Sequence, residues 1–265
     1  MNTTTGGLGW MYDRDLPLHN LTFARQINAR ELLERMGVDQ NTMAMREQDH
    51  FHYELGGHLY TDDGYVVSAG HYRSWAWAWE HGSWKGIEDR GLVPRASIGT
   101  AALELPASEK PGAVFRYAED GRLTTGLGTT DSSLARTGSD PHRFDTEIQA
   151  LGARPEEYEY GPRGSLGMFY RLAENLGVGL PLDDLNDRPV LSGRLLPPSL
   201  AVTAESLNTR AAFPRLGSTG RSADSLEGFD HLDQQRALSF VPISVTSSRM
   251  LLEPGWQRRH FSSSR

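Results

Sequence analysis

Residues 74–80 read SWAWAWE and place a tryptophan at every second position. In a β-strand, side chains two residues apart project from the same face of the sheet. Trp75, Trp77 and Trp79 would therefore share one face, and the small alanines between them would let a helix approach the other face closely. The segment predicts a strand whose two faces differ in chemistry.

Short segments of alternating or β-branched residues occur before and after this strand. They predict further strands at Leu21–Arg25, Tyr65–Ala69, Ala101–Leu105, Val114–Ala118 and Arg122–Leu127. Glu119-Asp120-Gly121 would join the last two as a tight hairpin, with a glycine available for positive φ. Because short connections pair neighbouring strands antiparallel, we expect an antiparallel sheet of about five or six strands.

Two amphipathic segments that follow the strands have apolar residues at helical spacing. The first, over residues 141–151, would be capped by Asp140, and the second, over residues 164–176, would end at Gly177. Strands followed by helices favour an α+β fold rather than the alternating pattern of a parallel sheet. We expect the helices to cover mainly one face of the sheet.

The residues before the sheet differ in how much regular structure they favour. Residues 1–15 lack an apolar period and are predicted to be a loose N-terminal leader. A helix over residues 29–36 would begin at the capping residue Asn28 and end at Gly37. The polar segment 38–63 is predicted to be a variable loop that contributes little to the core.

The chain has 265 residues, enough for one large domain with a hydrophobic core of its own. We expect the α+β domain to span residues 16–197, because Pro197 and Pro198 stop regular structure. Residues 198–265 are rich in serine and poor in apolar clusters, which is typical of a low-order tail. Within this tail, residues 238–245 have the β-branched and apolar content of an edge strand.

Composition excludes several classes of function. The chain contains no cysteine, which rules out disulfides, cysteine-ligated zinc, iron–sulfur clusters and cysteine nucleophiles. A net charge of −7 argues against nucleic acid as a partner, and no cofactor-binding motif is complete. No apolar run approaches the ~20 residues that cross a bilayer, and residues 1–10 lack the pattern of a secretory signal. We therefore expect a cytoplasmic protein with no cofactor and no membrane partner.

Trp75, Glu80, Trp84 and Gly86 stand at fixed offsets within one short segment. Further motifs are Ser97-Ile98-Gly99-Thr100, residues 115–121, Gly138-Ser139-Asp140-Pro141 and residues 173–177. Together these motifs resemble an actinobacterial family that is known only as domain of unknown function 6461. The resemblance extends over residues 16–197, although residues 38–63 match no pattern of the family. Because the family has no assigned activity, the resemblance implies domain boundaries and no catalytic residue.

The three alternating tryptophans allow two interpretations. As core residues they would be covered, since aromatic side chains dominate core burial. As an exposed platform they would anchor a protein segment or a small ligand, and Trp84 would extend that platform. No complete catalytic constellation accompanies them. The first hypothesis is therefore a non-enzymatic interaction or regulatory module that binds another protein through Trp75, Trp77, Trp79, Glu80 and Trp84.

Glu80 and the nearby histidines support an alternative hypothesis. A carboxylate among tryptophans would have a raised pKa and would act as a general acid or base, whereas a structural carboxylate would meet an arginine or backbone amides. The histidines in this region are His50, His52, His58, His71 and His81. They lack a complete ligand pattern, so no metal site is predicted. The alternative is an enzyme or a small-ligand or metal-binding protein, marked by a polar pocket that joins Glu80 to His50, His52 or His71.

Overall fold

The computed structural model describes residues 6–13, 18–59, 65–81, 89–108, 113–130 and 133–196. Contacts divide the chain into two units, Met1–Phe213 and Pro214–Arg265, and all of the described residues belong to the first. Trp84, Pro197 and the predicted tail lie outside the described residues. The domain boundary at Pro197 and the edge strand over 238–245 therefore stay predictions.

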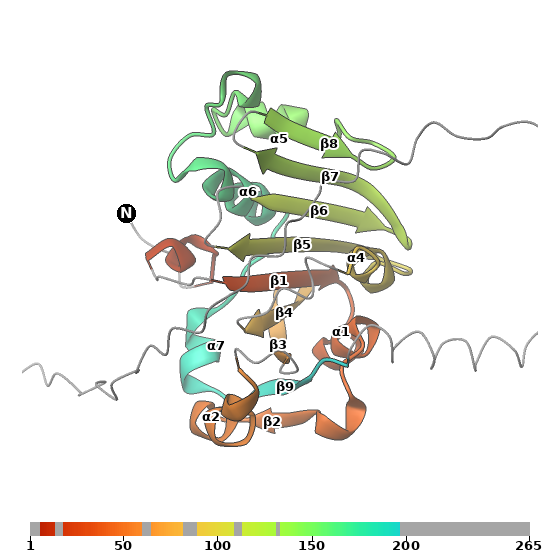
Figure 1. The fold of residues 1–265 in the computed structure, drawn as a ribbon, viewed down its shortest axis with the longest axis vertical. Helices are drawn as coiled ribbons and strands as arrows, with labels where there is room; N and C mark the ends of the chain where they lie inside the picture. The colour runs from red at the N-terminus through yellow and green to blue at the C-terminus, as the bar shows by residue number, and fades with distance from the viewer. Residues whose placement is uncertain are drawn as a thin grey trace, which may run out of the picture. The chain divides into compact units, whose positions relative to one another are not determined.

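Nine strands of the described residues form one antiparallel sheet, in the order β2-β9-β3-β4-β1-β5-β6-β7-β8 (Figure 1). The strands are β1 (Leu18–Arg25), β2 (Ala44–Arg46), β3 (Val66–Tyr72), β4 (Trp75–His81), β5 (Ala101–Ser108), β6 (Val114–Glu119), β7 (Arg122–Thr130), β8 (Ser133–Thr137) and β9 (Val190–Arg194). The antiparallel α+β fold is confirmed, but the expected number of about five or six strands is wrong. The additional strands, β2, β8 and β9, have only three or five residues each, too few for a clear alternating pattern.

The helices of the described residues are α1 (Ala29–Met36), α2 (Gln48–Leu55), α4 (Leu92–Ala96), α5 (Asp145–Ala150), α6 (Gly164–Asn175) and α7 (Leu182–Asp187). Short 3₁₀ turns are η1 (Gly9–Asp13), η2 (Gln40–Thr42), η3 (Gly56–His58) and η4 (Pro155–Glu157). Helix α6 confirms the helix predicted over residues 164–176. Among the described helices, none has the length and apolar character needed to cross a membrane.

Helix α1 begins and ends where the sequence predicts. Asn28 Oδ1 accepts a hydrogen bond of 2.9 Å from the backbone N–H of Glu31, which satisfies one of the amides that a helix start leaves unpaired. At the other end, Gly37 adopts the left-handed conformation, with φ of 89°. A residue with a side chain would be strained there, so the glycine ends the helix without a steric cost.

The helix predicted over residues 141–151 is shorter than expected, because α5 begins only at Asp145. The backbone of Asp140 bonds to β7 instead of capping a helix. Its N–H donates to the carbonyl of Thr124 at 2.8 Å, and its own carbonyl accepts from Thr125 Oγ1 at 2.7 Å. These bonds hold Asp140 against β7. Turns follow Asp140, and α5 begins after them.

Helices cover both faces of the sheet, which corrects the expectation that they lie mainly on one. Helices α5 and α6 contribute to the larger core, which includes Phe23, Trp77 and Phe115. On the opposite face, α1 lies over β3 and β4, and α4 lies over β5 and β6 (Figure 1). The core under α1 and α4 includes Ala76 and Ala78, so the small residues of β4 do admit helices closely. Helix α4 has only five residues, which hides its amphipathic pattern.

Residues 6–13 are packed, which corrects the expected loose leader for this part of the chain. Leu8, Trp10 and Met11 are buried in the larger core. The indole N–H of Trp10 donates to the carbonyl of Leu180 at 2.8 Å, which ties η1 to the segment after α6. Three apolar residues among glycines give no recognisable period, so the sequence pattern does not reveal their burial.

Residues 38–59 contribute more to the core than a variable loop would. Helix α2 buries Phe51 and Leu55, four residues apart, against Val66 of β3. Val38 is also buried, in the core beneath α1. The prediction of little core in this segment is therefore wrong, because two apolar residues on one turn of a helix suffice to dock it.

Candidate functional site

The tryptophans of β4 are mainly core residues. Trp75 and Trp77 are 3% and 0% exposed, so neither belongs to an exposed platform. Trp79 is partly buried and its ring stacks on His81, with the centroids 4.5 Å apart. Trp84 lies outside the described residues. The core interpretation is therefore correct for Trp75 and Trp77.

Glu80 lies on the opposite face of β4 and joins a buried polar cluster of Asn20, Glu80, Glu104 and Arg116. Asn20 Nδ2 donates to Glu80 Oε1 at 2.7 Å and to Glu104 Oε1 at 3.1 Å. Arg116 Nη1 donates to Glu104 Oε2 at 2.8 Å. The register of the sheet creates these contacts, since Asn20 pairs with Glu80 and Glu104 pairs with Arg116 across neighbouring strands.

The electrostatics of the cluster centre on Glu104. Burial raises its pKa to about 7; the Arg116 guanidinium opposes this rise, and the charge of Glu80 adds to it. Asn20 Oδ1 and Thr22 Oγ1 are buried beside the carboxylates without a hydrogen-bond partner. The group can hold a proton near neutral pH, but Asn20, Glu80 and Glu104 have no exposed surface that a substrate could reach.

The raised pKa of Glu104 predicts a pH-dependent stability. The folded state binds the proton more tightly than an ordinary glutamate of pKa 4.5, so stability is greatest below about pH 4.5 and falls as the pH rises through 7. The full difference is about 3 kcal/mol. Urea unfolding of the wild type and Glu104→Gln at pH 5 and pH 8 checks this. Relative to the wild type, the free energy of unfolding of Glu104→Gln should be higher at pH 8 than at pH 5 by about that amount. The same difference between the two proteins at both pH values would contradict the raised pKa.

The structure does not bring Glu80 and the histidines together. His50 and His52 are exposed on α2, where residues two positions apart point to different sides of the helix. His81 follows Glu80 and faces the other side of the sheet, with Nε2 2.9 Å from Ser68 Oγ. Burial, followed by the nearby His52 and His19, lowers the pKa of His81 to about 3, so its ring is neutral. Within the described residues, no group of three or more His, Asp or Glu is arranged to hold a metal ion.

A pocket of about 370 Å³ opens where β9 separates from β3. The ladder between these strands ends at the pair Ala69 and Leu191. Two pairs further along, Pro189 would stand opposite His71, and a proline has no N–H to continue the ladder. The pairing does not continue past Ala69 and Leu191, and residues 188–191 and 69–71 line the pocket together with the start of α1.

Trp77 forms part of the pocket wall as well as the core. Gly70 pairs with Trp77 across the two strands, and a Cβ on residue 70 would lie only 2.5 Å from Cζ2 of the indole. The ring therefore lies directly over the glycine. Its Nε1 is buried and has no hydrogen-bond partner among the described residues. The sequence places Trp77 on a strand face but gives no sign of this contact, which depends on the register of β3 and β4.

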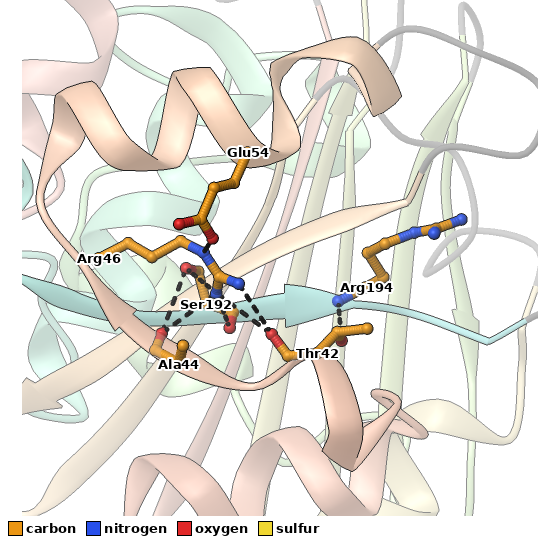
Figure 2. A network of polar contacts seen from close by, with 6 residues as sticks. All are labelled: Thr42, Ala44, Arg46, Glu54, Ser192 and Arg194. Carbon is orange, nitrogen blue, oxygen red and sulfur yellow. Dashed lines mark hydrogen bonds and ion pairs between the residues drawn. The ribbon is translucent and has the colours of Figure 1, made fainter.

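A buried arginine next to the pocket residue Met45 makes several polar contacts, as Figure 2 shows. Arg46 is 8% exposed, and its Nε donates to Glu54 Oε2 of α2 at 2.7 Å. Its Nη1 donates to the carbonyl of Ser192 at 2.9 Å, and both terminal nitrogens reach the carbonyl of Thr42 at 3.2 Å. These contacts hold β2 against β9 and α2. They leave the adjacent Met45, which is 63% exposed, at the pocket.

The pocket has a mixed lining. Its apolar part includes Met45, Trp77, Val190 and Leu191. Its polar part consists of Asn28, Arg30, His71 and Arg188. Of these residues, sequence reasoning singles out only Trp77, His71 and the capping Asn28. The other lining residues come from four separate segments of the chain, and only the folded sheet brings them together.

Comparisons with known proteins identify the family but no activity. The model of a family of unknown function (DUF6461) matches residues 1–174, well over half of the chain. The match includes the pocket residues of α1, β2, β3 and β4, whereas residues 188–191 lie beyond it. Neither a curated protein nor a solved structure matches the chain. This chain belongs to DUF6461, a family of unknown function.

Proposed function

We propose that this protein binds a small organic molecule in the pocket between β3, β9 and α1, and serves as a ligand-responsive regulatory module. The observation that carries the proposal is the pocket itself. Its volume of about 370 Å³ lies within the range of small-molecule sites, and a few polar groups converge on a largely apolar wall. The contacts of Arg46 with Glu54 and Ser192 hold β2, which carries the pocket residue Met45, in place without a ligand.

Binding fits this site better than catalysis does. Among the described residues that line the pocket, His71 is the one imidazole, and none is a serine, threonine or carboxylate. The carboxylate cluster of Glu80 and Glu104 is closed and belongs to strands β4 and β5 beneath the helices. The described lining therefore contains neither a serine, threonine or carboxylate nucleophile nor a paired acid and base.

A protein partner is less well supported than a small ligand. The interaction hypothesis needs the tryptophans of β4 on the surface, and Trp75 and Trp77 are buried. What remains of that hypothesis is a regulatory role, in which occupation of the pocket is the signal. The pocket joins residues of β2, β3 and β9 at one end of the sheet, so a ligand there would bind β9 to β3 where their ladder ends.

The proposal is tested with 1-naphthamide, a neutral bicyclic probe, added to the full-length, isotope-labelled protein. At about 0.3 kcal/mol per atom, a probe of this size would bind with a Kd near 1 mM. We expect saturable shifts of the backbone amide resonances of residues 69–71 and 190–191 in NMR spectra. Scattered shifts without saturation, or no shifts in these segments, would overturn the proposal.

Met45→Ala should weaken probe binding about fivefold, because it removes apolar contact area from the pocket wall. Tyr53→Ala is the matched control. Both side chains are largely exposed, at 63% and 89%, but Tyr53 does not line the pocket. The Kd of 1-naphthamide is measured for both variants by the same NMR titration. Equal Kd values for Met45→Ala and Tyr53→Ala would place the probe elsewhere.

A further inference from the structure

The charges that line the pocket all have one sign. Arg30 and Arg188 contribute guanidinium groups, and His71 contributes an imidazole. Among the described lining residues there is no aspartate or glutamate. This contrasts with the chain as a whole, whose net charge is −7. The pocket is therefore a local site for negative charge on an acidic protein.

The apolar lining limits what kind of anion fits. Met45, Val190 and Leu191 are aliphatic, and Trp77 contributes a flat aromatic edge. An inorganic anion would leave this surface in contact with water. A planar carboxylate suits the guanidinium group, which can donate two parallel hydrogen bonds to it. The lining thus combines a head-group site for a carboxylate with a wall for a hydrocarbon or aromatic body.

We infer that the ligand of this pocket is an organic acid with a single carboxylate on an apolar body. This inference rests on the proposed function, since it names the chemical class that the same site takes. Arg30 is the residue that best tests it. Arg188 also lines a neighbouring pocket, together with the acidic residues Glu47, Asp49 and Asp187. These carboxylates partly offset the positive charge of Arg188. Arg30 is exposed at the first turn of α1 and does not line that pocket.

The experiment compares 1-naphthoate with 1-naphthamide, two probes of nearly the same shape that differ in charge. Their Kd values for the full-length protein are measured by NMR titration at low and high salt. We expect 1-naphthoate to bind about tenfold more tightly, since a charge-assisted hydrogen bond is roughly twice as strong as a neutral one. Added salt should reduce this ratio, because the arginines are partly in solvent.

Arg30→Gln should remove most of the preference for 1-naphthoate and leave the Kd of 1-naphthamide nearly unchanged. Arg122→Gln is the matched control, because Arg122 is an exposed arginine of the β6–β7 hairpin and its loss changes the net charge equally. If both probes bind the pocket with the same Kd, or if the two variants behave alike, the ligand class is wrong while the proposed function stands. If neither probe shifts the amides of the pocket, the proposed function itself fails.

Discussion

Replacement of Trp77 by alanine is expected to lower the free energy of unfolding by about 3–5 kcal/mol. The side chain has no exposed surface and lies in the larger core with residues of α6 and η1. Truncation removes the apolar burial of the indole and leaves a cavity that the surrounding sheet can fill only in part. Urea unfolding followed by circular dichroism measures the loss.

Trp79→Ala is the control for this substitution, because it removes the same side chain from the same strand face. Trp79 is only partly buried, so its loss should cost clearly less than that of Trp77. An exposed platform would behave differently, with little change in stability for either variant and a loss of binding. Equal, small effects on unfolding would therefore contradict the core assignment of Trp77.

Local sequence signals predict the elements that depend on neighbouring residues. The helix between Asn28 and Gly37 has both of its ends in the sequence, and the structure shows both caps. The β6–β7 hairpin depends on Asp120 and Gly121, whose φ angles of 47° and 80° match the turn that suits a twisted pair of strands. The different chemistry of the two faces of β4 follows directly from the alternation of tryptophan and alanine along the strand. In each case a few adjacent residues contain the whole signal.

The rest of the fold depends on pairings between distant residues. Strand β9 pairs with β3 and β2, which precede it in the chain by more than a hundred residues, and its five residues have no distinctive period. Strand β1 lies between β4 and β5 rather than at an edge. A strand order of this kind follows from packing of the complete sheet, not from the composition of any single strand.

The dependence on pairings between distant residues also explains which parts of the candidate sites the sequence predicts. The sequence marks Glu80 as an unusual carboxylate but not its neighbours, because Asn20 and Glu104 meet it only when β1 lies between β4 and β5. The pocket requires the end of the β3–β9 ladder, which neither strand shows alone. The closed carboxylate cluster, which contains Glu80, and the open pocket, which contains His71, are therefore separate features.

Arg116→Met should destabilise the protein, and its cost should be about 1 kcal/mol greater at pH 8 than at pH 5. Arg116 is the cation that bonds to buried Glu104, and methionine keeps much of its apolar stem without the charge. At pH 8 the loss of the guanidinium would raise the pKa of Glu104 further, so the folded variant would have to take up a proton that the folded wild type lacks. Below the raised pKa of Glu104, the carboxyl group is neutral in both proteins, so the missing cation matters less.

Two comparisons separate this charge effect from a simple loss of packing. Arg143→Met removes the partner of Glu119, but both side chains of that pair are more than a third exposed, so the cost should be about 1 kcal/mol or less. The double variant Arg116→Met/Glu104→Gln should recover most of the stability lost at pH 8, since no charge then remains at residue 104. Unfolding in urea at both pH values gives all of these differences. A cost for Arg116→Met that is the same at pH 5 and pH 8 would show that Glu104 is not charged in the folded protein, and the proton-holding role of the cluster would have to be abandoned.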